Sequence, residues 1–140
     1  ENREKYKQLK IMDITQWLKE VVLPRIKVIR PKNRILLHPT CSCQIMGLTP
    51  VLLDIARKCA REVILPDNWG CCGASGDRGF IFPELSDSAT RDERDEIGHE
   101  SFDGCYSLAR TCEIAMQDHI EQPYESIVYL VDETIQDQGT

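Results

Sequence analysis

The chain contains seven cysteines among its 140 residues, and two of them are adjacent. Cys71 and Cys72 lie in the segment PDNWGCCGASGDRG, whose glycines allow the backbone to turn tightly and to approach a bound group closely. Thiolates are ligands of zinc and of iron–sulfur clusters, and the residue types alone do not choose between the two. An odd number of cysteines does not suit a secreted disulfide scaffold, so we expect metal ligands or redox thiols in the cytoplasm.

The predicted strands bring several of these thiols together. Short apolar runs read as strands at 34–37, 62–65 and 102–107, and each is followed by a cysteine or by the cysteine pair. The carboxyl ends of parallel strands share one edge of a sheet, and ligands bind there. We therefore expect four thiols to converge on a single metal centre at that edge. They are Cys41, Cys71, Cys72 and Cys112.

The other cysteines and a histidine allow more than one interpretation. Cys59 lies on the apolar face of a predicted helix, where a free cysteine packs as a small hydrophobic residue. Cys43 is either a spare thiol beside the centre or a further ligand. Cys105, within a predicted strand, is either a core residue or a fifth ligand. His38 is expected to orient a neighbour by hydrogen bonding, with metal contact as the alternative.

A charged pair follows the adjacent cysteines. Asp77 and Arg78 stand between two glycines and have no obvious core role. One interpretation is a turn closed by a local salt bridge, worth under about 1 kcal/mol when exposed. The other is that Arg78 compensates the charge of a thiolate-ligated cluster or binds a carboxylate at a domain interface. Candidate cofactor-binding residues are therefore Gly73, Gly76, Asp77 and Arg78.

Strands that alternate with helices predict a three-layer α/β fold, with a mainly parallel, Rossmann-like sheet of about four strands and helices on both faces. A lead-in segment is expected over residues 1–12, before a helix that Asp13 caps. The polar segment from 83 to about 100 is expected to be a solvated helix, with His99 and His119 in solvated helical positions. Other helices are predicted at 49–59 and 110–120, and the last strand at 126–131 (SIVYLV).

Composition narrows the class of protein. With 41% hydrophobic and 29% charged residues, the sequence fits a single globular domain over 1–140. The net charge of −6 and the absence of a concentrated basic stretch argue against nucleic-acid binding. No apolar run is long enough to span a bilayer. The charged opening ENREKYKQLK has neither an initiator methionine nor a signal peptide, so we expect a piece of a longer protein.

The cysteine segments resemble a known family. HPTC, WGCCGASGDRGF, YSLARTCE and SIVYLVDE resemble the cysteine-rich CCG domain shared by the iron–sulfur subunits of heterodisulfide reductase, glycolate oxidase and anaerobic glycerol-3-phosphate dehydrogenase. The longer segments HPTCSCQIMG, GCCGASGDRGFIFPEL and RTCEIA are most similar to the C-terminal part of bacterial FAD-linked D-2-hydroxyacid dehydrogenases that act on D-lactate or D-2-hydroxyglutarate. The similarity extends from about Ile35 to Glu133.

The resemblance implies a ligand set. The family pattern of a lone cysteine, a CCG pair and a closing C-x-x-C falls on the same four cysteines that the strand predictions select. The first position of the closing pair is Ala109, which cannot ligate. Unless Cys105 or Cys43 substitutes, four thiolates remain, which favours a 4Fe-4S cluster or zinc over a five-thiolate cluster.

The resemblance also implies a role. The family's ferredoxin-like motif and flavin-binding signatures are absent from this sequence and lie upstream in its relatives, so the isolated piece is not expected to be active. With FAD in the upstream domain, this domain would pass electrons from the flavin and ferredoxin-like domains towards a quinone or another acceptor. It would work in the cytoplasm or peripherally on the inner face of the membrane. The alternatives are a structural zinc module and a metal-free thiol module of the same enzyme.

Overall fold

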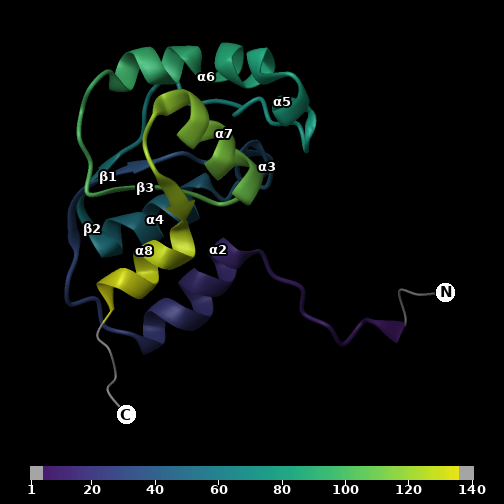
Figure 1. Cartoon of the computed structure of the whole chain (residues 1–140). Coiled ribbons are helices and arrows are strands. Elements are labelled where there is room, and N and C mark those ends of the chain that lie inside the picture. Colours follow the sequence, from purple (N-terminus) through teal and green to yellow (C-terminus); the bar gives the residue numbers. More distant parts are fainter. Residues whose placement is uncertain (1–4, 136–140) are drawn as a thin grey trace.

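A four-stranded sheet forms the centre of the computed structural model, which describes residues 5–135 (Figure 1). All neighbouring strands are parallel, and their order is β2-β1-β3-β4. The strands are β1 (Lys32–Leu37), β2 (Ala60–Ile64), β3 (Gly104–Ser107) and β4 (Tyr124–Ser126). The predicted parallel α/β class is confirmed. Residues 1–4 and 136–140 of the predicted domain lie outside the described residues.

Helices cover both faces of the sheet. Figure 1 shows α6 (Pro83–Ile97) and α7 (Arg110–Ile120) above the strands, with α4 (Thr49–Cys59), α8 (Ile127–Thr134) and α2 (Ile14–Trp17) below them. Side chains alternate between the two faces along each strand. Ile35 and Leu37 of β1 therefore pack with α4 and α8, whereas Leu36 packs towards α6 and α7. Three layers with two separate cores result.

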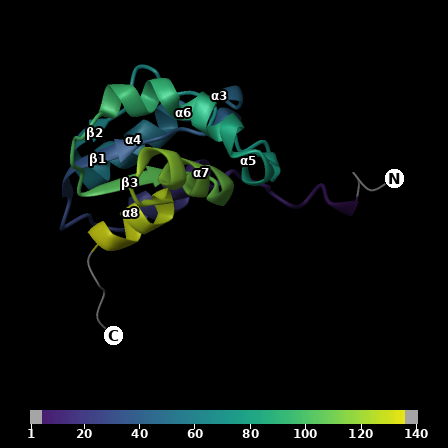
Figure 2. The ribbon, with the colours of Figure 1, turned by 45° about the horizontal axis from the view of Figure 1, so that its top comes forward.

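The strand order creates a switch point at the centre of the sheet. From β1 the chain crosses to β2 on one side, and it later returns to β3 on the other side. Ligands of such sheets bind outside the carboxyl ends of the strands at this point. Leu37 and Tyr106 pair across the ends of β1 and β3. Both views place α3 (Cys41–Ile45), α5 (Arg78–Ile81) and the start of α7 at this end of the molecule (Figures 1 and 2).

The predicted strand at 126–131 is wrong, because the segment is mainly helical. Only Tyr124–Ser126 forms β4, and Ile127–Thr134 forms α8. The Ser126 side chain caps the helix by accepting a hydrogen bond from the N–H of Val128 at 3.4 Å. The residues that α8 buries recur at helical spacing, and they are Ile127, Leu130, Val131 and Thr134. The sequence does not show this helical period, because the whole run IVYLV is apolar and its β-branched residues favour a strand.

The first helix is less regular than predicted. Asp13 caps it as expected and accepts a hydrogen bond from the N–H of Thr15 at 2.8 Å. After α2 the chain continues as a π-helical turn, η1 (Leu18–Val22), and a 3-10 turn, η2 (Leu23–Arg25). The buried face differs from the predicted apolar stripe, because Thr15 and Leu18 are buried whereas Ile14 and Trp17 are 38% and 43% exposed. Of the predicted lead-in, residues 5–12 form one turn and otherwise no regular element.

Candidate metal centre

Two thiols of the predicted ligand set are in contact. Cys72 lies in the loop after β2, and Cys112 is the third residue of α7. Their Sγ atoms are 3.0 Å apart, and both side chains are buried. The hydrogen bond with Cys112 stabilises the thiolate of Cys72 and lowers its pKa, while the same interaction, together with burial, raises the pKa of Cys112. Of the two, Cys72 is therefore the more readily deprotonated.

The other two predicted ligands lie at the exposed rim of this pair. Cys41 is the first residue of α3, which Thr40 caps by accepting a hydrogen bond from the N–H of Cys43 at 3.2 Å. Cys71 and Cys41 are both exposed. The N–H of Gly73, 3.4 Å from the Cys71 sulfur, favours the thiolate. Burial and the neighbouring thiols outweigh that hydrogen bond, so the pKa of Cys71 is raised.

The four thiols interact electrostatically, but in the described structure they are not arranged as the ligands of a metal ion. Cys72, Cys41 and Cys71 all contribute to the raised pKa of Cys112. Within residues 5–135, however, no three Cys, His, Asp or Glu side chains are arranged to hold a metal ion as they stand. Two sulfurs at about 2.3 Å from a tetrahedral ion lie about 3.8 Å apart, so a contact of 3.0 Å must open by about 0.8 Å to admit one.

The glycines around the cysteine pair shape the loop in different ways. Gly73 has a φ of 74°, and a Cβ there would lie 2.6 Å from the carbonyl oxygen of Leu85. A Cβ on Gly79 would lie 2.5 Å from the Ser86 hydroxyl. Both glycines therefore allow the loop to pack against the start of α6. Gly76 has open space around it and is required for its φ of 77°.

The charged pair after the cysteines stands apart from them. Asp77 occupies the N-cap position of α5 but makes no side-chain capping hydrogen bond, and Arg78 is the first residue of that helix. Both are exposed. In the described structure Asp77 and Arg78 form no ion pair with each other, so the turn is not closed by a salt bridge. Arg78 is thus left at the surface, on a helix that lies at the same end of the molecule as α3 (Figures 1 and 2).

A buried polar group that the sequence did not reveal lies under the thiol pair. His38 and Glu93 are 1% and 2% exposed, and Nδ1 of His38 is 2.9 Å from Oε2 of Glu93. The ring of Tyr124 stands edge-on to the imidazole, with centroids 6.5 Å apart. Nε2 of His38 and the Tyr124 hydroxyl have no hydrogen-bond partner in the described structure. The sequence predicts that His38 forms a hydrogen bond with a neighbour, and in the structure that neighbour is Glu93.

The sequence does not predict a buried Glu93, because the polar helix around it is expected to be solvated. The helix exists, but one of its faces is buried, and that face consists of Ser86, Thr90, Glu93 and Ile97. These positions are three or four residues apart, as on one side of a helix. Their spacing was the available signal, although three of the four are polar. His99 is exposed after the helix, whereas His119 on α7 is only 17% exposed, so the solvated position predicted for His119 is wrong.

The remaining cysteines divide between the two cores. Cys59 is fully buried against the α4 and α8 side, in agreement with its predicted core role. Cys43 packs in the same core, on the opposite face of the sheet from Cys72. Cys105 lies on β3 in the core of the thiol pair, and burial raises its pKa to about 12. A neutral, buried Cys105 fits a core residue better than a fifth ligand.

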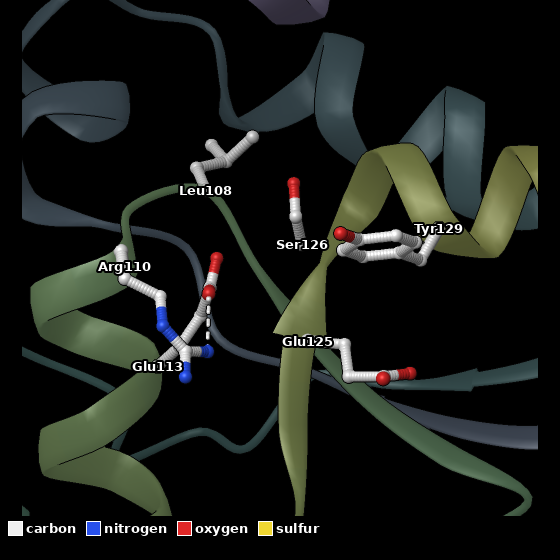
Figure 3. Close-up of a pocket in the computed structure, with 6 residues that line it drawn as sticks. All are labelled: Leu108, Arg110, Glu113, Glu125, Ser126 and Tyr129. Atoms are coloured by element: carbon white, nitrogen blue, oxygen red, sulfur yellow. Dashed lines mark hydrogen bonds and ion pairs between the residues drawn. The ribbon is translucent and has the colours of Figure 1, made fainter.

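A separate cavity of about 470 Å³ opens beyond the ends of β3 and β4. Figure 3 shows Arg110 and Glu113 of α7 across from the strand and helix that carry Ser126 and Tyr129. Nη1 of Arg110 lies 3.3 Å from Oε2 of Glu113. Leu108 and Glu125 complete the lining. No thiol lines this cavity, so it is distinct from the cysteine site.

Comparisons with known proteins do not assign the chain to a group. No family model, no curated protein and no solved structure matches it. Among the described residues, none of the helices combines the length and apolar character needed to cross a bilayer. Any functional assignment therefore rests on the geometry of the thiols and on the motifs that contain them.

Proposed function

We propose that this domain is an electron-transfer module with a cysteine-ligated iron–sulfur centre at the carboxyl edge of its sheet. The observation that carries the proposal is the buried Cys72–Cys112 contact of 3.0 Å. Its sulfurs come from segments 40 residues apart, and the exposed thiols of Cys41 and Cys71 interact with them electrostatically. Core packing alone does not require four thiols to share one charged neighbourhood.

The donor set suits such a centre. Four thiolates are the usual ligands of a 4Fe-4S cluster, and zinc also accepts four. The Gly73 N–H that points at the sulfur of Cys71 is the kind of hydrogen bond that tunes a cluster's reduction potential. Beneath the thiols, the unpartnered Nε2 of His38 leaves a buried polar atom that a bound group would satisfy. These residues fit either metal, and the one-electron role favours iron–sulfur.

The chain's own residues would divide the work. A bound cluster supplies a one-electron store. Cys72 and Cys112 would anchor it on the buried side, where α6 and α7 exclude water. Cys41 and Cys71 would hold the exposed side, through which electrons enter or leave. Arg78, an exposed cation at the same end of the molecule, would offset part of the negative charge that four thiolates bring.

Partner domains belong to the same proposal. Exposed apolar side chains adjoin Arg78 on and after α5, and they are Phe80, Ile81 and Phe82, at 46%, 63% and 50% exposure. An apolar surface of this kind, at the same end of the molecule as α3, suits the ferredoxin-like domain of the same polypeptide. The motif resemblance supports an FAD-linked D-2-hydroxyacid dehydrogenase, working in the cytoplasm or on the inner face of the membrane, with a quinone or another compound as acceptor.

Metal and sulfide analysis after anaerobic purification tests the proposal. We expect about four iron and four sulfide per chain, with a reducible visible spectrum. Cys72→Ser and Cys112→Ser should lose most of the iron, whereas Cys59→Ala, in the opposite core, should retain it. One zinc per chain without sulfide would replace the electron-transfer role with a structural one. A chain without bound metal under these conditions would refute the metal centre.

A metal-free redox thiol is the second candidate, because the same 3.0 Å contact favours it. Conversion to a disulfide needs a sulfur separation of about 2.05 Å, a movement of about 1 Å. Oxidation would release two electrons and two protons to an acceptor such as a partner disulfide. Counting free thiols with and without reductant tests this. A loss of two thiols in the wild type, but not in Cys72→Ser, would support it.

A further inference from the structure

His38 holds a fixed position at the switch point of the sheet. It follows β1 directly, and its N–H donates a hydrogen bond to the carbonyl of Tyr106 at 2.9 Å. The hydroxyl of Ser107 donates to the carbonyl of His38, also at 2.9 Å. Alternation along the strand puts His38 on the same face as Leu36, which packs in the core that contains Cys72 and Cys112. Both strands that define the switch point thus anchor this residue.

The contact with Glu93 sets the state of the imidazole ring. A carboxylate only accepts hydrogen bonds, so the ring hydrogen stands on Nδ1 and faces Glu93 at 2.9 Å. A neutral imidazole with its hydrogen on Nδ1 exposes a lone pair on Nε2. Carboxylate–histidine pairs of this kind orient histidines that ligate metals, because the second ring nitrogen is fixed and made more basic. The His38–Glu93 pair has this arrangement, with Nε2 as the ring nitrogen that remains for a further contact.

The free nitrogen cannot be explained as ordinary core packing. Nε2 is fully enclosed and has no hydrogen-bond partner in the described structure, whereas buried polar atoms of native proteins nearly always have one. The Tyr124 ring approaches the imidazole edge-on, but its hydroxyl is also without a partner. His38 lies near enough to Cys72 to contribute to that thiol's lowered pKa, although the main cause is the hydrogen bond with Cys112. Tyr124 packs in the core that contains Cys72 and Cys112, so the imidazole beside it lies in that core as well.

We propose that Nε2 of His38 is a nitrogen ligand of the metal centre, bound beside Cys72 and Cys112, and that Glu93 positions it. The inference rests on the proposed metal centre and adds to its ligand set. Mixed imidazole and thiolate ligands suit zinc, and in iron–sulfur centres an imidazole in place of a thiolate raises the reduction potential. Opening of the Cys72–Cys112 contact is the movement that such binding requires.

X-ray absorption at the iron and zinc K-edges of the anaerobically purified chain tests the ligand directly. We expect sulfur scattering together with the outer-shell pattern of one imidazole, and His38→Gln should remove that pattern. The control His119→Gln changes another histidine of the α6 and α7 layer and should preserve it. A sulfur-only shell in the wild type, or imidazole scattering that survives in His38→Gln, would overturn the inference while leaving the metal centre intact. A chain with neither iron nor zinc would overturn both.

Affinity for Zn²⁺, added alone to the reduced, metal-free chain, gives a second measurement. His38→Gln should weaken binding by about 100-fold or more, and Glu93→Gln by about 10- to 100-fold, the range seen when a histidine loses its orienting carboxylate. His119→Gln should bind like the wild type. If His38→Gln fails to fold, Glu93→Gln and the wild-type absorption spectrum decide. Wild-type affinity in folded His38→Gln or in folded Glu93→Gln would contradict the proposal.

Discussion

The two faces of the sheet use the same residue types for different purposes. On the side of α4 and α8, Cys43 and Cys59 pack among leucine and isoleucine side chains as small hydrophobic residues. On the side of α6 and α7, Cys72 and Cys112 contact each other in a core that also encloses His38 and Glu93. Among the described residues, the buried polar side-chain atoms without a partner belong to the second side. Satisfied packing on one face and unsatisfied polar groups on the other separate the supporting core from the candidate site.

The apolar face should be the more sensitive to a cavity. Leu130 of α8 is fully buried, so Leu130→Ala should lower the free energy of unfolding by about 3–5 kcal/mol. Val128 is 37% exposed, and Val128→Ala should cost less than about 1 kcal/mol. Urea unfolding of both variants checks this. If 126–131 were a strand, the two side chains would share a face, and equal losses would contradict helix α8.

The face of the thiols should be the more sensitive to its backbone. Gly73→Ala adds a methyl group at 2.6 Å from a backbone oxygen and at a φ of 74°, which should cost about 2–4 kcal/mol. Gly70→Ala is the matched control, because nothing lies within 4 Å of its added carbon. Its unfolding free energy should stay within about 0.5 kcal/mol of the wild type. A Gly73→Ala variant as stable as Gly70→Ala would show that the loop can leave α6 without cost.

Apolar patterning accounts for what could be predicted of the fold. The runs before Cys41 and Cys71 formed strands, and the stripe at 110–120 formed α7 at the predicted bounds. The same reasoning failed at 126–131, where every position between Ser126 and Asp132 is apolar and only tertiary packing separates period 2 from period 3.6. The π-helical turn of η1 was equally hidden, because the stripe fitted a regular helix.

The site could be predicted only in part for a related reason. Cysteines after strands identified which thiols share an edge, since topology alone places those segments together. The contact between Cys72 and Cys112 depends on side-chain positions that spacing does not define. The burial of Glu93 could not be predicted, because a carboxylate on a polar helix is ordinarily exposed. Only the folded arrangement, with His38 opposite, explains why this one is buried.

Thiol reactivity should sharpen the contrast within the metal-free, reduced chain. Cys105, with its pKa raised to about 12, has roughly three orders of magnitude less thiolate near neutral pH than an ordinary thiol of pKa about 8.5. Burial also raises the pKa of Cys43 and Cys59. Iodoacetamide should therefore modify exposed Cys41 first and these three only on unfolding. Mass spectrometry of timed samples checks the order, and early modification of Cys59 would contradict the tight packing of the α4 and α8 side.

The smallest effect on stability is expected at the amino ends of the strands, the opposite end of the sheet from the thiols. Asp103, just before β3, accepts hydrogen bonds from the N–H groups of Asn33 at 2.7 Å and Arg34 at 3.2 Å. These two bonds lower the pKa of Asp103. A carboxyl group whose pKa is lower in the folded state adds stability above its unfolded pKa of about 3.9, and that stability is lost as the pH falls through the folded value.

Asp103→Asn should therefore be less stable than the wild type at pH 7, and the difference should shrink as the pH falls below about 4. Because Asp103 is exposed to solvent, we expect a small shift of the urea midpoint and not a change of fold. Glu96→Gln is a parallel test, since Glu96 accepts hydrogen bonds from the N–H groups of Asp67 and Asn68 near the cysteine loop. A midpoint difference that persists unchanged into acid would show that these hydrogen bonds do not depend on the carboxylate charge. The backbone groups that Asp103 and Glu96 contact would then be stabilised without a contribution from the carboxylate charge.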